Sequence, residues 1–279
     1  MKKISVIIVN YKNHVETINC INSINTCTHN DQVEIIVVNN ESTTQSLADL
    51  TQIKNESRVP VKIIPSEKNL YYWGGAALGI SQYLFTDPDS PKWIIIANND
   101  ILFQQTDFFS ILLSMDAGEY EVVAPKITLK QTGENQNPHL IHPHSIAQKI
   151  YYKLYYFHPV TAKAVHGLGR FIRKNVVAEK DQCISAKEMK IYAPHGACII
   201  FSKEYFLQGG YIDNGFTFYG EEISVAEISR EIGLSITYIP VLEVLHNEHS
   251  STRSSDWLTS YNRAKKTYRY LRKKYALKT

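Results

Sequence analysis

Four short apolar runs, separated by polar stretches compatible with helices, limit the folds open to this chain. The runs cover residues 4–9, 33–38, 61–65 and 93–97, and each is mostly apolar rather than strictly alternating. Parallel strands buried on both faces read in this way, whereas half-exposed antiparallel strands alternate. After the first run, apolar residues recur every three positions from Val15 to Ile24, as on one helix face. The pattern predicts an α/β fold with a mostly parallel sheet flanked by helices.

Asparagine and aspartate gather where three of these runs end. The polar residues at the run ends are Asn10, Asn39, Asn40, Asn98, Asn99 and Asp100. Open parallel sheets bind their ligands at the carboxyl ends of the strands. Oxygen atoms of this kind hold Mg²⁺ or Mn²⁺ and a diphosphate, although an Asx-rich turn uses the same residues only to satisfy its own backbone. Both interpretations of this edge stay open on the residues alone.

A glycine pair stands in the segment at residues 69–79, which reads Asn-Leu-Tyr-Tyr-Trp-Gly-Gly-Ala-Ala-Leu-Gly. Before a predicted helix, Gly74 and Gly75 would let the backbone approach a phosphate or a sugar, and a purely packing role is the alternative. The segment has neither the G-x-G-x-x-G spacing nor the lysine of a P-loop. A dinucleotide-binding fold and a nucleoside triphosphatase are therefore disfavoured.

Two adjacent acids, Glu221 and Glu222, open a helix predicted over residues 221–232, with Gly233 as its C-cap. An acid at a helix start can act as a general base or simply favour the helix dipole. His246 follows an apolar run and is either a metal ligand or a surface imidazole. Its surroundings do not have the H-E-x-x-H spacing, so zinc-peptidase chemistry has no support.

Charge is divided unevenly along the 279 residues, whose net charge is +3. Residues 253–279 hold nine Lys or Arg against one Asp, so the rest of the chain is net acidic. Leu and Tyr among these basic residues predict an amphipathic C-terminal helix, which either packs on the domain or contacts an anionic membrane. The acidic remainder argues against nucleic-acid binding.

Cellular location follows from what the sequence lacks. Its longest apolar runs have the length of a strand, whereas a membrane-spanning helix needs about 20 apolar residues. The first run is also too short for a secretory signal, although Lys2 and Lys3 precede it. The four cysteines form no C-x-x-C pair, which argues against a disulfide framework and a Cys-rich zinc site. We expect a cytoplasmic protein with reduced thiols.

The regular pattern weakens over residues 128–190, which we interpret as an insertion or an acceptor-side subdomain. A Tyr-rich run at residues 150–157 lies among basic residues that could contact a lipid-linked acceptor, namely Lys149, Lys153, Lys163, Arg170, Arg173 and Lys174. A variable surface subdomain is the alternative. We interpret the cluster of His139, His142 and His144 as a loop rather than a metal site, because no Cys or acid stands at ligand spacing.

Taken in order along the chain, these motifs resemble those of the family 2 glycosyltransferases. The resemblance covers residues 4–252 and rests on residues 4–11, 37–43, 69–79, 98–100, 196–198, 210–213, 219–222 and 246. It is greatest to the rhamnosyltransferase-like members that assemble bacterial surface polysaccharides. It implies a GT-A fold, a nucleotide-sugar donor, a Mg²⁺ or Mn²⁺ cofactor and inversion at the anomeric carbon.

The resemblance also implies roles for single residues. Asp100 closes a D-x-D-like metal motif, His246 completes the metal site, and Glu222, with Glu221 beside it, supplies the general base. The donor-binding residues that it implies are Asn10, Asn39, Asn40, Asn69, Gly74, Gly75, Asn98 and Asn99. The chain departs from the family pattern at Asn39, Glu222 and Ser224, where Asp is common, at Tyr71, where Gly is common, and at Ala77, where Asn is common.

We therefore expect four parts. These are a donor-binding half at residues 1–127, an acceptor-side insertion at 128–190, a catalytic and acceptor half at 191–252 and a basic helix at 253–279. The predicted activity is metal-dependent, inverting hexosyl or rhamnosyl transfer from a UDP- or dTDP-sugar to a glycan or lipid-linked glycan. The alternative, motivated by Glu222 and Ser224, is a catalytically weak GT-A-fold binding subunit of a glycan-assembly complex.

Overall fold

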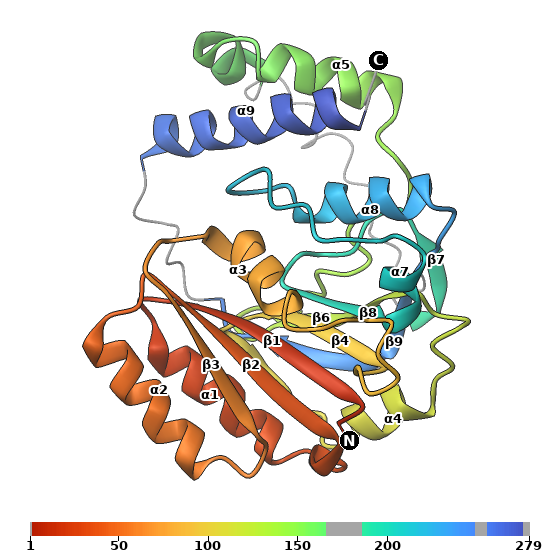
Figure 1. Ribbon diagram of the computed structural model, residues 1–279. Helices are drawn as coiled ribbons and strands as arrows, with labels where there is room; N and C mark the ends of the chain where they lie inside the picture. The colour runs from red at the N-terminus through yellow and green to blue at the C-terminus, as the bar shows by residue number, and fades with distance from the viewer. Residues whose placement is uncertain (1, 166–185, 249–255, 276–279) are drawn as a thin grey trace.

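The computed structural model describes residues 2–165, 186–248 and 256–275, and within them nine strands form one sheet (Figure 1). Eight of the strands follow one another across the sheet as β3 (Val61–Ser66), β2 (Val33–Asn40), β1 (Ile4–Tyr11), β4 (Trp93–Asn98), β8 (Cys198–Ser202), β6 (Val122–Leu129), β9 (Ile236–His246) and β5 (Ile101–Leu102). The ninth, β7 (Met189–Ile191), pairs with β9.

The four strands predicted from the apolar runs make the parallel half of the sheet, where β1 pairs with β2 and β4, and β2 pairs with β3. Register sets Asn10 beside Asn39 and Val9 beside Asn98. The polar run ends therefore meet at one edge of the sheet, as expected for parallel strands.

The second half of the sheet is mixed. Strand β8 is antiparallel to β4 and β6, whereas β9 is parallel to β6 and antiparallel to β5 and β7. The apolar runs at residues 234–239 and 241–245 belong to the single long strand β9, which ends at His246. This strand carries His246 from the distant C-terminal part of the chain to the edge where β4 ends.

Helices cover both faces of the sheet, which is why the strands are apolar without alternation. Helices α1 (His14–Asn25), α2 (Thr44–Glu56) and α4 (Phe108–Ser114) share a core with Val6 and Ile8. Helices α3 (Tyr71–Ile80), α7 (Lys203–Leu207) and α8 (Glu221–Glu231) share a second core with Ile7 and Val9 on the other face. The predicted α/β fold is thereby confirmed. Val15, which the spacing placed on a buried face, is instead 54% exposed in the first turn of α1.

The predicted C-terminal helix is α9 (Trp257–Lys274), and it lies between the body of the protein and α5 (Ile146–Tyr155) (Figure 1). Its N-cap is Asp256, whose carboxylate accepts hydrogen bonds from two backbone N–H groups of the first turn. Leu271 and Tyr275 join the core beneath. On the inner side, Tyr270 and Tyr275 donate their hydroxyls to Asp213, at 2.7 and 2.6 Å. The amphipathic helix therefore packs on the domain by its aromatic and Leu face.

Candidate active site

The asparagines at the ends of β1 and β2 form a closed hydrogen-bond network. Asn10 Nδ2 donates to Asn39 Oδ1 at 2.8 Å, and Thr17 Oγ1 donates to Asn10 Oδ1 at 2.7 Å. Asn39 Nδ2 in turn donates to the hydroxyls of Ser42 and Ser46. Asn10 and Asn39 are both buried. The network leaves Asn39 Oδ1 one lone pair for a further donor, so its predicted contact with a nucleobase stays a prediction.

Asn40 and Asn69 hold the turn that leads into α3. Asn40 Nδ2 donates to the Tyr71 carbonyl at 2.9 Å, and Asn69 Oδ1 accepts the Tyr71 N–H at 2.8 Å. Tyr71 has φ = +59°, a left-handed conformation that glycine adopts most easily. This conformation gives a physical reason for the loop glycine that is common at this position in the family resembled.

Gly74 and Gly75 lie inside helix α3 rather than before it, so the prediction of a loop was wrong. A Cβ on Gly75 would stand 2.7 Å from Val9 Cγ1, and one on Gly79 would stand 2.6 Å from Ile7 Cγ2. The glycines thus let the helix lie directly on β1. This explains why tertiary packing outweighs their low helix propensity. A contact of Gly74 or Gly75 with the donor stays a prediction.

Asp100 and His246 are brought together from β4 and β9, and Asn247 N–H donates to the Asp100 carbonyl at 2.9 Å. His246 Nε2 lies 3.2 Å from Asp100 Oδ1, and His246 Nδ1 lies 2.7 Å from Gln136 Oε1. Because an amide oxygen only accepts, Nδ1 carries a proton, and Nε2 is the ring nitrogen that faces Asp100. Asp100 Oδ1 is buried and accepts no hydrogen bond from the described residues.

An imidazole nitrogen and a carboxylate oxygen therefore face each other at this edge, where they can pair directly or hold a cation between them. An imidazole held by a neighbouring amide and a carboxylate are ordinary metal ligands. Among the described residues, no set of three His, Cys, Asp or Glu side chains gathers to hold a metal ion. A Mg²⁺ or Mn²⁺ ion here would complete its coordination with water and diphosphate oxygens, as Mg²⁺ commonly does.

Asn98 and Asn99 shape the turn that carries Asp100. The Asn98 N–H donates to the Ala197 carbonyl at 2.8 Å, which ties the end of β4 to the segment before β8. Asn99 Nδ2 donates to the Asn13 carbonyl at 3.0 Å. Both asparagines thus have structural partners, and their contact with a donor stays a prediction.

The acid pair lies next to this turn. Gly196 N–H donates to Glu222 Oε1 at 3.2 Å, and Gly220 N–H donates to Glu221 Oε2 at 2.9 Å. A Cβ on Gly196 would stand 2.5 Å from Glu221 Cγ, so only glycine fits there. Through residues 196–197, the structure brings the acid pair and the Asp100 turn into one site.

The two acids have different electrostatic surroundings. Burial, together with the charge of Glu222, raises the pKa of Glu221 to about 8. Burial also raises the pKa of Glu222 above its ordinary value. Two buried carboxylates side by side repel each other, so the pair holds a proton more readily than isolated glutamates do.

His195 lies beside this site, and the sequence reasoning missed it. Its Nδ1 accepts the Ala197 N–H at 3.2 Å, and its ring centroid lies 5.4 Å from that of His139. Burial lowers the pKa of His195 to about 3, so the ring is neutral. The available signal was its place directly before the Gly-Ala-Cys motif at residues 196–198.

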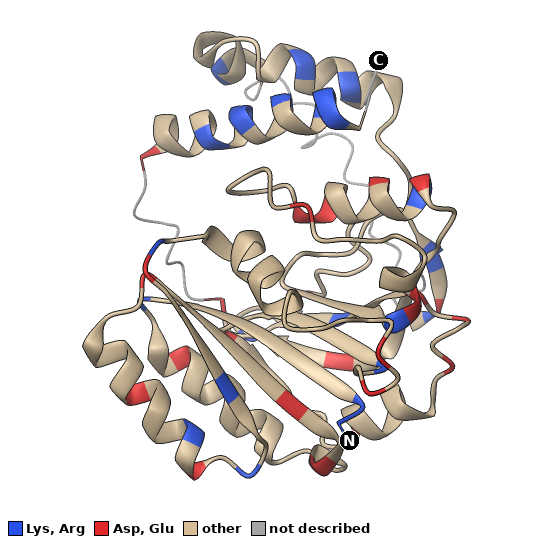
Figure 2. Ribbon diagram, viewed as in Figure 1, with Lys and Arg blue, Asp and Glu red and all other residues tan. Residues whose placement is uncertain are grey.

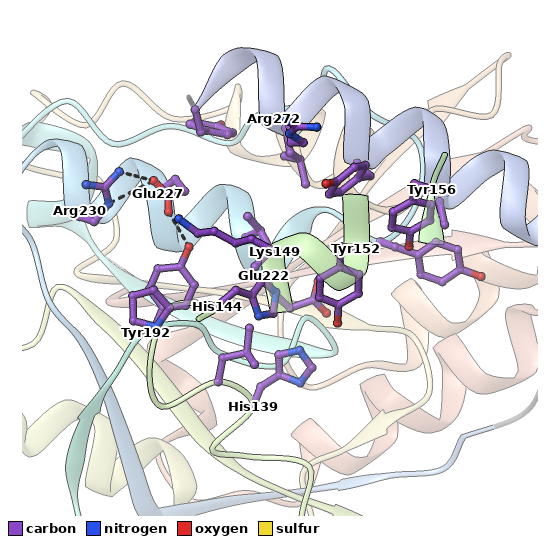
Figure 3. Close-up of a pocket in the computed structure, with 18 residues that line it drawn as sticks. His139, His144, Lys149, Tyr152, Tyr156, Tyr192, Glu222, Glu227, Arg230 and Arg272 are labelled. Atoms are coloured by element: carbon purple, nitrogen blue, oxygen red, sulfur yellow. Dashed lines mark hydrogen bonds and ion pairs between the residues drawn. The ribbon is translucent and has the colours of Figure 1, made fainter. Parts of the chain in front are cut away.

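A cavity of about 650 Å³ is lined in part by Glu222 (Figure 3). Its walls come from residues 139–144, α5, α8 and α9, and include Lys149, Tyr152, Tyr156, Tyr192, Glu222, Glu227, Arg230, Tyr268 and Arg272. Glu227 accepts hydrogen bonds from the Tyr192 hydroxyl and from Arg230 Nε, the latter at 3.1 Å. Aromatic walls with a few fixed polar groups are typical of ligand sites.

Sequence reasoning identified this wall only in part. The Tyr-rich run and the basic residues around it had been predicted to contact an acceptor, and Lys149, Tyr152 and Tyr156 of this set line the cavity. Arg170, Arg173 and Lys174 of the same set lie outside the described residues. Tyr192, Glu227 and Arg230 were missed. Glu227 and Arg230 follow Ile223 at helical spacing, which could have placed them on the face of α8 that bears Glu222.

A protein similar to this chain is the low-salt glycan biosynthesis hexosyltransferase Agl10 of Haloferax volcanii, which is 23% identical over 247 residues. The match covers 88% of this chain and 67% of that protein.

In the described residues, no helix combines the length and the apolar composition needed to cross a membrane.

Solved structures of similar fold include GalNAc-T7 with UDP, GalNAc and Mn²⁺ (14% identity, TM-score 0.56) and S. aureus TarS (12%, 0.56). A third is the mannosyltransferase PcManGT of Pyrobaculum calidifontis with GDP-Man and Mn²⁺ (10%, 0.54). Each match covers 89–90% of this chain but only 45%, 37% and 59% of those chains, respectively. This chain therefore spans about half the length of these structures. These likenesses confirm the predicted GT-A fold.

The model of the family described as Glycosyl transferase family 2 matches residues 5–179, which is more than half of the chain. The matched residues include the Asn10 and Asn39 network and Asp100, whereas Glu222 and His246 lie beyond them. The predicted family is thereby confirmed: this chain belongs to glycosyl transferase family 2.

Proposed function

We propose that the chain is an inverting glycosyltransferase that transfers a hexosyl or rhamnosyl group from a UDP- or dTDP-sugar to a hydroxyl group of a glycan or lipid-linked glycan in surface polysaccharide synthesis. The observation that carries the proposal is the position of Glu222. Its carboxylate accepts from Gly196 beside the Asp100 turn, and its side chain also lines the aromatic cavity. A single carboxylate thus stands between a predicted donor edge and a cavity that can hold an acceptor.

In the proposed reaction, Glu222 accepts the proton of the acceptor hydroxyl while the hydroxyl oxygen forms a bond to the anomeric carbon. The bond from that carbon to the diphosphate breaks at the same time, and the nucleoside diphosphate leaves with the bonding electrons. Attack from the face opposite the leaving group inverts the anomeric carbon. The raised pKa values of both acids favour one proton on the pair, so a single negative charge would be available to act as the base.

Asp100 and His246 would hold the divalent ion. Bound there, Mg²⁺ or Mn²⁺ supplies positive charge that neutralises the departing diphosphate. The approach of His246 Nε2 to Asp100 Oδ1, which accepts no hydrogen bond from the described residues, supports this assignment. Metal dependence is thus part of the proposal, and the cytoplasmic location and membrane contact stay predictions.

The acceptor would lie in the cavity among Tyr152, Tyr156 and Tyr268. Tyrosine rings offer flat apolar faces together with a hydroxyl, and both suit a sugar ring. The cavity also carries Lys149 and Arg272, which suit an acceptor with an anionic group.

The test is thermal unfolding of the wild type and of Asp100→Ala with UDP, dTDP, GDP or NAD, each with and without Mn²⁺. Only a ligand that prefers the folded state raises the midpoint. We expect a Mn²⁺-dependent rise with UDP or dTDP that is absent in Asp100→Ala, and none with NAD. Donor turnover would then be measured with sugars of the nucleotide that binds. A nucleotide shift without any turnover would instead support the binding-subunit alternative.

A further inference from the structure

Helix α5 and the residues that follow it carry an aliphatic and aromatic stripe that faces solvent. The stripe consists of Ile146, Ile150, Leu154, Phe157 and Val160, which are 70%, 48%, 51%, 73% and 68% exposed. Ile146, Ile150 and Leu154 lie four residues apart on one face of α5, whereas Phe157 lies in the turn after the helix and Val160 in the helical segment that follows. Such a face ordinarily packs against a core, so its exposure marks an interaction surface.

The opposite face of α5 is fixed to α9. The rings of Tyr156 and Tyr268 stack with centroids 4.6 Å apart, and those of Tyr155 and Tyr261 lie 5.8 Å apart. Lys265 Nζ also donates to the Phe157 carbonyl at 2.8 Å. The stripe therefore cannot turn inward without breaking these contacts, and its partner must come from outside this packing.

The layer formed by α5 and α9 is rich in positive charge, and negative charge is nearly absent from it. Residues 146–165 and 257–274 contain no Asp or Glu, and the N-cap Asp256 is the acid next to them. Figure 2 shows this layer with Lys and Arg in blue, whereas acids in red lie across the rest of the molecule. The exposed cations include Lys153, Lys163, Lys266, Arg269 and Lys273.

We propose that the outward face of α5 docks on the surface of an anionic lipid bilayer. Apolar side chains on a basic helix enter the boundary between headgroups and acyl chains, while neighbouring lysines reach the lipid phosphates. A second copy of this chain fits less well, because the same positive charges would face one another. Nucleic acid would use the cations and leave the apolar stripe exposed.

The proposed membrane binding is inferred from the geometry and charge of this surface, and it does not depend on sugar transfer. Its position has one consequence for the proposed acceptor. Tyr152 and Tyr156 on the same helix line the cavity that Glu222 also borders. A bilayer bound to the outer face of α5 would therefore lie beside the cavity that the inner face lines.

The test is co-sedimentation of the full chain with phosphatidylcholine vesicles, with and without phosphatidylglycerol. Wild type is expected to bind only the vesicles that contain phosphatidylglycerol. The variant Ile150→Ser, Leu154→Ser, Phe157→Ser should lose at least about tenfold in partitioning, because it removes the inserting side chains. Its matched control, Leu84→Ser, Leu207→Ser, Val241→Ser, replaces residues of similar exposure elsewhere and should bind as wild type does.

Two further measurements separate the electrostatic contribution to vesicle binding from the insertion of apolar side chains. The variant Lys266→Glu, Arg269→Glu, Lys273→Glu should abolish the preference for phosphatidylglycerol. Trp257 is 42% exposed while Trp73 and Trp93 are buried, so tryptophan fluorescence should shift to the blue when wild type binds vesicles.

The proposal is overturned if wild type ignores anionic vesicles, or if the serine variant at residues 150, 154 and 157 binds them as well as wild type does. Unchanged circular dichroism and an unchanged nucleotide-induced midpoint in that variant would show that it is folded. If the chain binds vesicles but shows neither a nucleotide-induced shift of the unfolding midpoint nor donor turnover, the proposed glycosyl transfer is wrong. The membrane-binding proposal would then still hold.

Discussion

The sheet edge proposed to bind the donor and the cavity proposed to hold the acceptor are built in opposite ways. At the proposed donor edge, Asn10, Asn39 and Asn40 are buried, and hydrogen bonds tie each of them to a neighbouring residue. The cavity instead has open space of about 650 Å³ and walls from helices far apart in the sequence. A pre-organised polar edge suits a conserved chemical group such as a diphosphate, whereas an open aromatic cavity suits an acceptor that differs between enzymes. Glu222 is where the two meet.

The largest expected effect is a loss of catalysis without a loss of nucleotide binding when Glu222 is replaced. In Glu222→Gln, we expect kcat to fall by about 10²–10⁴-fold, because the amide cannot accept a proton from the acceptor. The nucleotide-induced rise in unfolding midpoint should be kept. A nearly wild-type kcat would show that another residue is the general base. Loss of nucleotide binding in the same variant would show that donor binding also depends on Glu222.

A second prediction concerns the rigidity of the donor edge. Gly75→Ala would set a Cβ 2.7 Å from Val9 Cγ1 and should cost about 1–3 kcal/mol of unfolding free energy, measured in urea. The matched control is Gly74→Ala, which would meet only Leu70 Cβ at 3.3 Å and gains helix propensity. Equal stability of the two variants would refute the close approach of α3 to β1.

A smaller effect is expected at the acceptor cavity. Tyr152→Ala should raise the KM for the acceptor by about tenfold while the donor KM is unchanged, because the ring lines the cavity only. Tyr151→Ala, on the same helix but outside the cavity wall, is the control for loss of an aromatic ring. Steady-state kinetics with each substrate varied in turn would measure both KM values. A changed donor KM in Tyr152→Ala would argue against separate donor and acceptor regions.

The smallest expected effect is in the pH dependence of stability. Because the pKa of Glu221 is raised to about 8, the folded state binds this proton more tightly than the unfolded state does. Its stabilising contribution is present below the ordinary glutamate pKa and is lost as the pH rises to about 8. Glu221→Gln should therefore flatten the fall of the unfolding midpoint between about pH 4.5 and pH 8, whereas Glu119→Gln at the surface should not.

The parallel half of the fold could be predicted because its signals are local. Strands buried on both faces produce continuous apolar runs, and the register that follows brings Asn10 to Asn39 without further information. The order of the motifs likewise indicated that Asp100, Glu222 and His246 belong to one site. Their roles in the reaction are still predictions.

What could not be predicted depends on contacts between distant segments. Gly75 looked like a loop residue, since its helical state comes from packing on Val9 rather than from propensity. Tyr192 and Arg230 carry no motif, and they join the cavity wall only because α8 approaches the segment before β8. The position of His195 before the Gly-Ala-Cys motif was its one signal in the sequence, because its neutral state results from burial in the folded protein.

Phe218 gives the two regions a thermodynamic link. Its ring contacts Tyr71 at the donor edge with centroids 4.9 Å apart, and its carbonyl accepts a hydrogen bond from Thr267 of α9 at 2.7 Å. Any ligand that favours the docked position of α9 therefore also favours the conformation of the residues around Phe218. By reciprocity, a donor that orders Tyr71 would tighten whatever binds through α9 by the same factor.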